Sequence, residues 1–245
     1  MARIRSGELG DVFFSTCEAG DQRMAGFQQA TGKQLFTIPL AADKFTMLKG
    51  KNQPQFVSDL AYIGTNLPAK RKFFRQVIFP LRSMYKTKFY GQDWTYLNQL
   101  LGLGQKVGQY FNLDFLKTIR KPNLQLSDEA DIYHSAKICL NVHESYQVEF
   151  GGDCNERTFK IPLAGGFELV DDVACIRRYF IPDKEIIIAR DKKDWQEKIA
   201  YYLTHPQEKK QIIAARKKRV LRDHTYHNRV KLIIDLYRQN KKSGK

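Results

Sequence analysis

The residues with the clearest chemical potential follow a short apolar run at 60–63, where a loop opens onto a helical stretch. Gly64 and Thr65 form this loop, and Lys70 and Arg71 stand just inside the following helix. A glycine lets a ligand approach the backbone, and the start of a helix favours a phosphate. The two cations can donate charge-assisted hydrogen bonds to a diphosphate. A tight turn before a solvated basic helix has the same pattern, so both interpretations stay open.

Two further positions place an aromatic or titratable side chain directly after an apolar run. Trp94 follows the run at 87–90, and it either stacks on a nucleotide base or caps the core, which is the commoner role. His143 follows the run at 137–142, and its imidazole suits an acid–base role because its ordinary pKa lies near neutrality. A structural histidine is the alternative, since the sequence fixes no partner for it.

His224 and His227 are spaced so that they can share one face of a helix. Zinc enzymes normally supply three protein ligands, often from an HExxH motif, and the sequence offers neither a third ligand nor that motif. A helix start is the favoured interpretation, and we expect no metal. GxGxxG and Walker lysine motifs are also missing from the sequence, which disfavours ordinary Rossmann dehydrogenases and P-loop enzymes.

The elements that must position these residues alternate between strands and helices. Strands are predicted at 11–16, 35–38, 60–63, 87–90, 137–142, 167–170 and 185–189. Helices are predicted at 18–32, 69–82, 157–164 and 192–237, with breaks near Pro206 and at 223–225, and a further helix begins at Ser127. The segment 107–111 is interpreted as a short strand or a loop. The alternation predicts an α/β fold, a parallel sheet with helices on both faces, whose ligands bind outside the carboxyl ends of the strands.

Composition narrows the class of protein. The chain has 245 residues, 42% of them hydrophobic, and a mean hydropathy of −0.49, which is typical of a soluble protein with a core of its own. We find no uncharged apolar run of about 18 residues and no signal peptide. The four cysteines form no CxxC pair, which favours reduced thiols in a cytoplasmic protein.

The formal net charge of +15 is the strongest compositional signal. Such a charge is expected of a protein that binds nucleic acid, an acidic membrane surface or a phosphorylated substrate, or of one whose cations simply lie on a solvated surface. Many of the basic residues lie between 209 and 245, on stretches that predict polar helices. A solvated face is the favoured interpretation there, and a membrane surface or a polyanion is the alternative.

Five segments occur in an order that resembles a known family. They are LAYIGTNLPAKRKFF, KFYGQDW, YHSAKICLNVH, NERTFKIPLAGGFELVDD and HTYHNRVKLII, between about residues 57 and 237. The chain resembles the C-terminal, donor-binding half of CgeB-like, or spore-maturation-protein-like, glycosyl transferases of the group-1 family, which have the GT-B fold. The resemblance implies a Rossmann-like domain at 51–240, preceded at 1–50 by the end of an N-terminal Rossmann-like domain and the crossing between domains. Residues 241–245 are expected to be a disordered basic tail.

The resemblance also implies two groups of site residues and no cofactor. The residues expected at the donor diphosphate are Gly64, Thr65, Lys70, Arg71, Arg157 and Thr158. The residues expected near the base and sugar are Tyr133, Lys137, Asn141, Asn155, Phe159 and Lys160. The implied reaction moves a glycosyl unit from a nucleotide sugar to an acceptor hydroxyl, and it assigns no catalytic residue and no metal.

Two features depart from the family pattern. Lys160 stands where the family usually has a glutamate that accepts hydrogen bonds from ribose, and an ammonium group cannot accept one. The resemblance also implies that this chain holds only the last strand and helix of the first of the two GT-B domains. The hypotheses are a truncated gene product, one half of a split enzyme, or a donor-binding remnant.

The leading functional hypothesis is a glycosyltransferase that acts alone or with a separate N-terminal half. A non-catalytic protein that binds nucleotides or nucleotide sugars is the alternative, and a basic protein that binds an anionic surface or nucleic acid is the third. The expected partners are a nucleotide sugar, a glycan, lipid or protein acceptor, a separate N-terminal domain protein, and a membrane surface that meets the basic C-terminal helices. Nucleic acid is disfavoured. The expected location is cytoplasmic, with the inner membrane face as a peripheral site.

Overall fold

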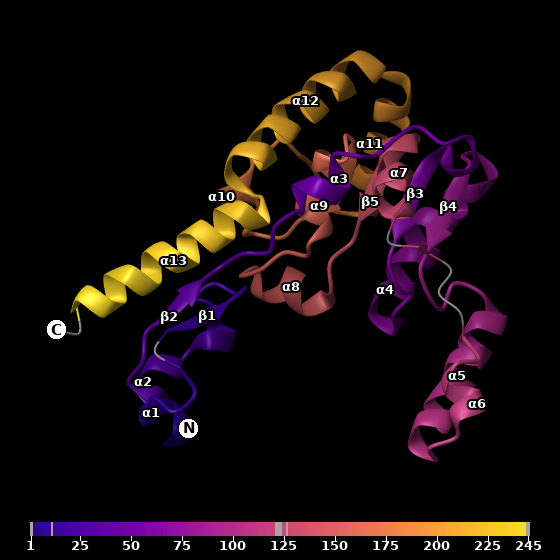
Figure 1. Ribbon diagram of the computed structural model, residues 1–245. Coiled ribbons are helices and arrows are strands. Elements are labelled where there is room, and N and C mark those ends of the chain that lie inside the picture. The colour runs from indigo at the N-terminus through magenta and orange to yellow at the C-terminus, as the bar shows by residue number, and fades with distance from the viewer. Residues whose placement is uncertain (1, 11, 121–123, 126, 244–245) are drawn as a thin grey trace.

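The computed structural model describes residues 2–10, 12–120, 124–125 and 127–243. A small N-terminal unit hangs below a larger α/β domain (Figure 1). This unit contains α1 (Ala2–Arg5), β1 (Phe13–Ser15), η1 (Gln22–Met24), α2 (Phe27–Thr31) and β2 (Leu35–Thr37). Strands β1 and β2 pair in parallel and form a sheet of their own, separate from the main sheet.

The main sheet has five parallel strands in the order β4–β3–β5–β6–β7. The strands are β3 (Ser58–Ile63), β4 (Thr87–Tyr90), β5 (Ala136–Asn141), β6 (Glu168–Asp171) and β7 (Ile187–Ala189). Since β3 pairs with β4 on one side and with β5 on the other, the direction in which strands are added reverses between β3 and β5. Such a switch point leaves a crevice beyond the carboxyl ends of the two strands, where α/β proteins bind ligands.

Helices cover both faces of the main sheet (Figure 1). The helices beyond the N-terminal unit are α3 (Lys44–Met47), η2 (Pro54–Phe56), α4 (Pro68–Phe73), η3 (Phe74–Ile78), η4 (Phe79–Ser83), α5 (Tyr96–Tyr110), α6 (Asp114–Lys117), α7 (Asp128–Ser135), α8 (Ser145–Phe150), α9 (Arg157–Leu163), α10 (Ile176–Tyr179), α11 (Lys192–Thr204), α12 (Pro206–Asp223) and α13 (Tyr226–Ser243). Of these, α5, α6 and α13 extend away from the sheet (Figure 1). Alternate strand residues supply two cores, one against α7, α9 and α10 and the other against η3 and α11. The predicted α/β architecture is confirmed.

Several boundaries differ from those predicted. The helix expected at 18–32 is replaced by the shorter η1 and α2. Gly26, between them, has a left-handed φ of 80°, which breaks the helical backbone. The segment 107–111 is not a strand, since α5 continues to Tyr110. Helix α13 ends at Ser243, so part of the tail predicted to be disordered is helical, and residues 244–245 lie outside the described residues. The predicted break at Pro206 is confirmed.

The start of α13 holds the segment that connects the N-terminal unit to the main domain. The Arg229 guanidinium donates hydrogen bonds to the carbonyl oxygens of Pro39 at 2.8 Å and Leu40 at 3.1 Å. The backbone of Ala42 pairs with that of Thr225. This part of the C-terminal segment therefore has a structural role.

A pH effect follows from the histidine at the same junction. Burial lowers the pKa of the His224 imidazole to about 4, and the nearby Arg229 guanidinium adds to the effect. The unfolded chain takes up a proton near pH 6.5 while the folded chain does not, so stability falls as the pH drops from about 6.5 towards 4. We expect the free energy of unfolding to fall by about 2 kcal/mol between pH 7 and pH 5. Urea denaturation of His224→Gln at both pH values provides the comparison, and equal losses in both proteins would contradict the assignment to His224.

Candidate functional site at the switch point

Three residues predicted at a diphosphate converge on Tyr62, near the carboxyl end of β3. The Lys70 ammonium lies 3.4 Å from the Tyr62 hydroxyl, and the Arg157 guanidinium carbon lies 5.4 Å from the centre of its ring. A Cβ on Gly64 would lie 2.8 Å from the same hydroxyl. The structure therefore brings a close backbone approach and two cations together at the switch point.

The glycine loop is closed on its other side by Trp94. The indole Nε1 donates a 2.8 Å hydrogen bond to the Gly64 carbonyl. The indole also stacks on Phe89 with 4.5 Å between ring centres, and it contacts Phe74 edge to face. Trp94 is half-buried and packs against the edge of the core, in agreement with the structural interpretation of this residue. Thr65 follows Gly64 in the loop and is half-buried.

Asn141, at the end of β5, connects the second part of the site. Its Nδ2 donates to Glu168 Oε1 at 2.8 Å and to Thr158 Oγ1 at 3.1 Å. Its Oδ1 accepts from Asn155 Nδ2 at 2.8 Å and from Arg157 Nε at 3.0 Å. Asn141 is fully buried, so its amide fixes the loop before α9 and the first residues of that helix. Four of the predicted residues are therefore held by one network.

A buried ion pair also holds two residues of this network, Glu168 and Thr158. Arg216 on α12 lies 2.9 Å from Glu168 Oε2 and donates to the Thr158 carbonyl at 2.8 Å. Burial raises the pKa of the Glu168 carboxyl and lowers the pKa of the Arg216 guanidinium, while the mutual attraction opposes both shifts. Neither residue could be predicted from the sequence, because their pairing depends on the packing of α12 against α9.

His143 has a fixed partner, Asp171, at the carboxyl end of β6. The ring Nδ1 lies 2.6 Å from Asp171 Oδ1, and the His143 amide donates to Oδ2 at 2.8 Å. The other ring nitrogen lies 3.4 Å from Thr158 Oγ1. The partner was missed, although the two aspartates that directly follow an apolar strand run could have indicated it. The side chain of His143 is buried, so the pair joins β5, β6 and α9.

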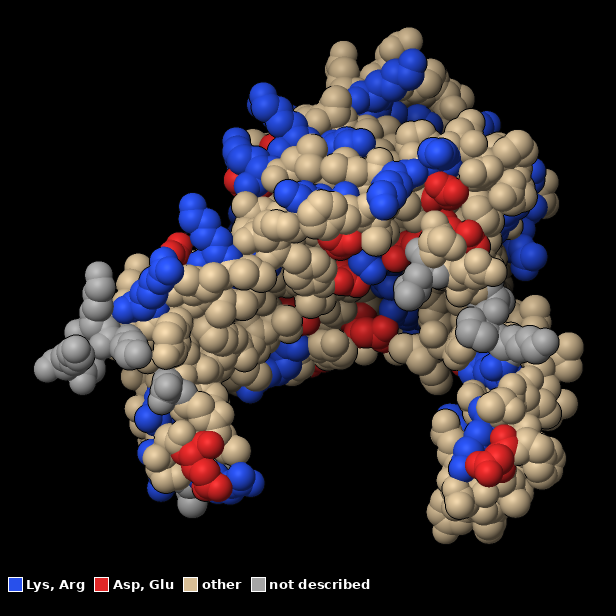
Figure 2. Space-filling model, in the orientation of Figure 1, with Lys and Arg blue, Asp and Glu red and all other residues tan. Residues whose placement is uncertain are grey.

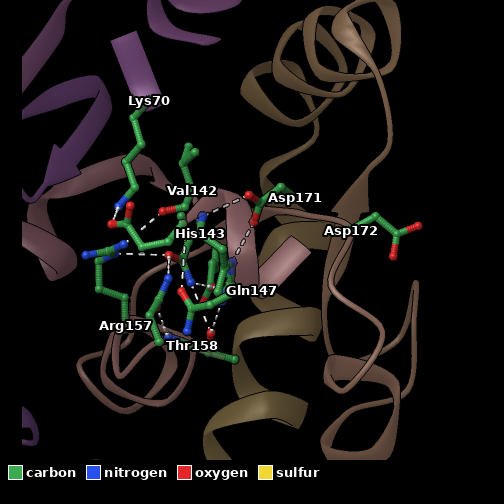
Figure 3. A network of polar contacts seen from close by, with 12 residues as sticks. Lys70, Val142, His143, Gln147, Arg157, Thr158, Asp171 and Asp172 are labelled. Atoms are coloured by element: carbon green, nitrogen blue, oxygen red, sulfur yellow. Dashed lines mark hydrogen bonds and ion pairs between the residues drawn. The ribbon is translucent and has the colours of Figure 1, made fainter. Parts of the chain in front are cut away.

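A cavity of about 440 Å³ opens beside this pair. Its walls come from α4, from the carboxyl ends of β5, β6 and β7, and from α11, and they include Lys70, Val142, His143, Asp171, Asp172 and Trp195. Figure 3 shows the polar contacts of this region, with Asp171 directed towards His143 and Asp172 directed away. Lys70 is only 6% exposed and pairs with Glu144 at 2.5 Å.

The site borders a wide hollow between the N-terminal unit and the α5–α6 region. Figure 2 shows this hollow, with acidic and basic side chains on the surface of the main domain that forms its upper side. On the N-terminal side, Arg23 pairs with Asp153 at 2.5 Å, and Gln147 Nε2 donates to the other Asp153 oxygen at 2.9 Å. The N-terminal unit is therefore tied to the loop that leads into α9.

Tyr133 and Lys160 form a separate group on the α7–α9 side. The Lys160 ammonium pairs with Glu156 at 2.7 Å and with Glu129 at 3.1 Å, and the Tyr133 hydroxyl donates to Glu129 at 3.0 Å. Burial opposes the charge on Lys160, but its two carboxylate partners outweigh burial and raise its pKa. Burial raises the pKa of Tyr133. The position where the resemblance implies a glutamate is thus occupied by a cation with acidic partners of its own.

Three predicted residues lie away from these groups. Lys137 is near the amino end of β5, opposite the edge that carries the site, and pairs with Asp59 at 2.8 Å. Arg71 donates to the Asn66 carbonyl at 3.2 Å and faces another cavity, since successive helix residues point in different directions. Phe159 is fully buried against Tyr179 and Phe180.

The pairing of Lys160 changes what its replacement should do. In Lys160→Glu three carboxylates would meet at one half-buried position, so we expect the free energy of unfolding to fall by about 1–3 kcal/mol. Chemical denaturation measures this loss. Glu129→Gln in the same chain should recover part of it, and an unchanged stability of the single variant would contradict the observed pairing. The double variant is also the better protein for testing whether a glutamate at this position tightens nucleotide-sugar binding.

Among the described residues, no cluster of three or more histidine, cysteine or acidic side chains is arranged to hold a metal ion. Within the same residues, no helix combines the length and apolar character needed to cross a bilayer.

Comparison with known proteins identifies related sequences and folds. A sequence model of the family described as glycosyl transferase-like matches residues 70–235. Spore protein CgeB of Bacillus subtilis (strain 168) is 24% identical over 215 residues, which cover 84% of this chain and 62% of that protein. This chain therefore spans about three-fifths of the length of that curated relative.

Solved structures of similar fold are GT-B glycosyltransferases. Sucrose-phosphate synthase from Thermosynechococcus elongatus superposes with a TM-score of 0.62 at 12% identity, over 96% of this chain and 59% of that one. An alpha-glucosyltransferase in complex with UDP-glucose and DNA containing an abasic site gives a TM-score of 0.57 at 11% identity, over 94% of this chain and 66% of that one. The fold and the resemblance to CgeB-like sequences are confirmed.

Proposed function

The chain belongs to the glycosyl transferase-like family, and we propose that its main domain binds a nucleotide sugar and serves the transfer of the glycosyl unit to an acceptor hydroxyl. The convergence of Lys70 and Arg157 on Tyr62 at the switch point carries this proposal. A similar fold occurs in complex with UDP-glucose. The crevice at a switch point is where an α/β sheet receives a nucleotide.

The geometry suggests what each group would contribute. During transfer the bond between the sugar carbon and the diphosphate oxygen breaks, and a bond to the acceptor oxygen forms as that oxygen loses its proton. Negative charge collects on the leaving diphosphate, where fixed cations lower the barrier. Arg157 is held in place by Asn141 and by the Val142 carbonyl at 2.9 Å. Lys70 is paired with Glu144, so a diphosphate that reaches Lys70 must displace that carboxylate.

The N-terminal unit is relevant to where the acceptor would bind. A two-stranded parallel sheet is an unusual free-standing structure, because parallel sheets are normally larger and covered on both faces. The separate β1–β2 sheet and the partial coverage of the relatives support a role for further polypeptide in completing the acceptor site. We therefore include in the proposal an acceptor that bears a hydroxyl group and a further polypeptide that completes the site for it.

Arg157→Ala tests the donor site. We expect the variant to bind a nucleoside diphosphate sugar about 5–150-fold more weakly, because it loses a charge-assisted hydrogen bond of about 1–3 kcal/mol. Titration calorimetry with UDP-glucose measures the effect. Arg71→Ala is the matched control, since Arg71 faces another cavity and its loss should leave affinity nearly unchanged. Equal affinities in wild type and Arg157→Ala would remove Arg157 from the site.

A non-catalytic nucleotide-sugar-binding protein is the second candidate, and the pairing of Lys160 favours it. Glu129 and Glu156 neutralise the ammonium group at the position where the family usually has a carboxylate. Binding without turnover would support this candidate, provided that hydrolysis and transfer are both assayed. No thermal stabilisation by any nucleotide would count against both candidates, because a ligand that binds only the folded state must raise the Tm.

A further inference from the structure

The α5–α6 hairpin carries an apolar face that nothing in the described chain covers. It projects from the main domain at the end of the molecule opposite α12 (Figure 1). The large side chains of α5 that are more than half exposed are Tyr96, Leu97, Leu100, Leu103 and Tyr110, and Phe111, directly after the helix, is exposed as well. Phe115 on α6 is 71% exposed. Exposed apolar patches of this extent mark interaction surfaces.

The hairpin is built to present this face outwards. The exposed apolar residues of α5 recur every three or four positions, so they share one side of the helix. The side that packs inwards contains the buried Gly102 and Gly108, where a Cβ would lie 3.0 Å from Arg120 Nη1 and 2.5 Å from Leu116 Cβ respectively. Gly108 allows the close approach of α6 and Gly102 that of Arg120, so the inner side of α5 carries small residues and its large ones lie outside.

The charge around the hairpin indicates what kind of surface meets it. The segment 68–120, which contains the hairpin, has ten lysines and arginines but only two aspartates and no glutamate, a net charge of +8. One of these cations, Lys70, is buried and paired with Glu144, so it adds nothing to the surface charge near the hairpin. Both aspartates are already paired, Asp93 with Arg120 and Asp114 with Lys117. An apolar helix face with surplus cations beside it is the pattern of helices that lie in the interface of an anionic membrane.

The cations lie next to the apolar face. Arg71 and Arg75 line a cavity of about 220 Å³ together with Trp94, Tyr96 and Gln99, at the start of α5. Arg75 and its neighbour Lys72 are exposed. Tyr96 and Tyr110 at the two ends of α5 are the amphipathic residues that favour the level of the lipid headgroups. A second copy of this chain fits less well, since both copies would carry the same positive field.

We propose that the α5–α6 hairpin docks the protein on an anionic membrane surface, with the apolar face of α5 in the bilayer interface and Lys72 and Arg75 at the lipid phosphates. The docking does not depend on the donor site. It also differs from contact through the basic C-terminal helices, because α12 lies on the far side of the domain from the hairpin (Figure 1).

Vesicle flotation of the full chain tests this proposal. We expect binding to vesicles of phosphatidylcholine mixed with phosphatidylglycerol and little binding to phosphatidylcholine alone. The variant with Leu100→Gln and Leu103→Gln should bind the mixed vesicles at least about tenfold more weakly, because each leucine loses its burial in the apolar interface. The exposed leucines of the C-terminal helices give the matched control, Leu221→Gln with Leu232→Gln, which should bind like wild type.

Charge variants separate the two basic surfaces. Lys72→Glu with Arg75→Glu should weaken binding to mixed vesicles by roughly fivefold or more per residue, and Lys217→Glu with Lys218→Glu on α12 should not. Loss of binding in the α12 pair alone would overturn the proposal. So would absent vesicle binding, wild-type binding by the α5 leucine variant, or a wild-type dimer that this variant turns into a monomer.

Discussion

Arg216→Met is expected to lower the free energy of unfolding by about 3–5 kcal/mol. The guanidinium and the Glu168 carboxylate are both buried and lie 2.9 Å apart. Removal of the cation leaves a buried carboxylate without its charge partner, and the desolvation cost of that charge is then uncompensated. The Thr158 carbonyl also loses its 2.8 Å hydrogen bond from Arg216. Urea denaturation at pH 7 measures the loss.

Two further variants isolate the cause. Glu168→Gln added to Arg216→Met should recover most of the stability, because the buried charge is gone while an acceptor for Asn141 remains. Lys193→Met breaks the exposed pair with Glu197 and should cost less than about 1 kcal/mol. A loss in Arg216→Met as small as that in Lys193→Met would refute the structural role given to the buried pair.

Gly91→Ala is expected to lower the free energy of unfolding by about 2–5 kcal/mol. A Cβ at this position would lie 2.5 Å from the Gly64 carbonyl oxygen and 2.7 Å from its carbon. These are backbone atoms of the switch-point loop, so they cannot rotate away as a side chain could. The φ of +113° at Gly91 adds strain for any other residue. Nucleotide-sugar affinity should fall as well, because the new methyl group displaces Gly64.

Gly104→Ala is the control for this variant. Gly104 lies within α5, where no atom stands within 4 Å of an added Cβ. Alanine there should leave stability unchanged or raise it by up to about 1 kcal/mol, because it removes backbone entropy from the unfolded chain. Thermal denaturation followed by circular dichroism compares the two variants. Equal effects would mean that the close contact at Gly91 does not constrain the loop.

The sequence predicts those elements whose signals are local. The runs at 60–63, 87–90 and 137–142 are apolar because parallel strands are covered on both faces, and all three are strands in the main sheet. The segment 107–111 was misleading because its apolar residues are exposed on a helix and are not covered as those of a buried strand are. Val107 and Phe111 lie on the exposed apolar face of α5, so their pattern reflects no contact with the core.

The candidate site could be predicted only in part. Gly64, Asn141 and Arg157 each follow a strand or begin a helix, so the topology brings them to one edge. Glu144 and Arg216 could not be predicted, because Glu144 meets Lys70 only through the position of α4, and Arg216 meets Glu168 only when α12 packs against α9. Lys137 lies near the amino end of β5, at the edge opposite the candidate site, and its predicted place near the base and sugar stays a prediction.

The donor site at Tyr62 and Asn141 is the central claim, and a ligand–protein double-mutant cycle tests it most directly. Titration calorimetry would compare UDP with uridine in wild type and in Arg157→Ala. We predict that wild type prefers UDP over uridine and that Arg157→Ala loses most of this preference, since Arg157 and the diphosphate contact each other. An equal preference in both proteins, or no binding of UDP by wild type, would contradict the account.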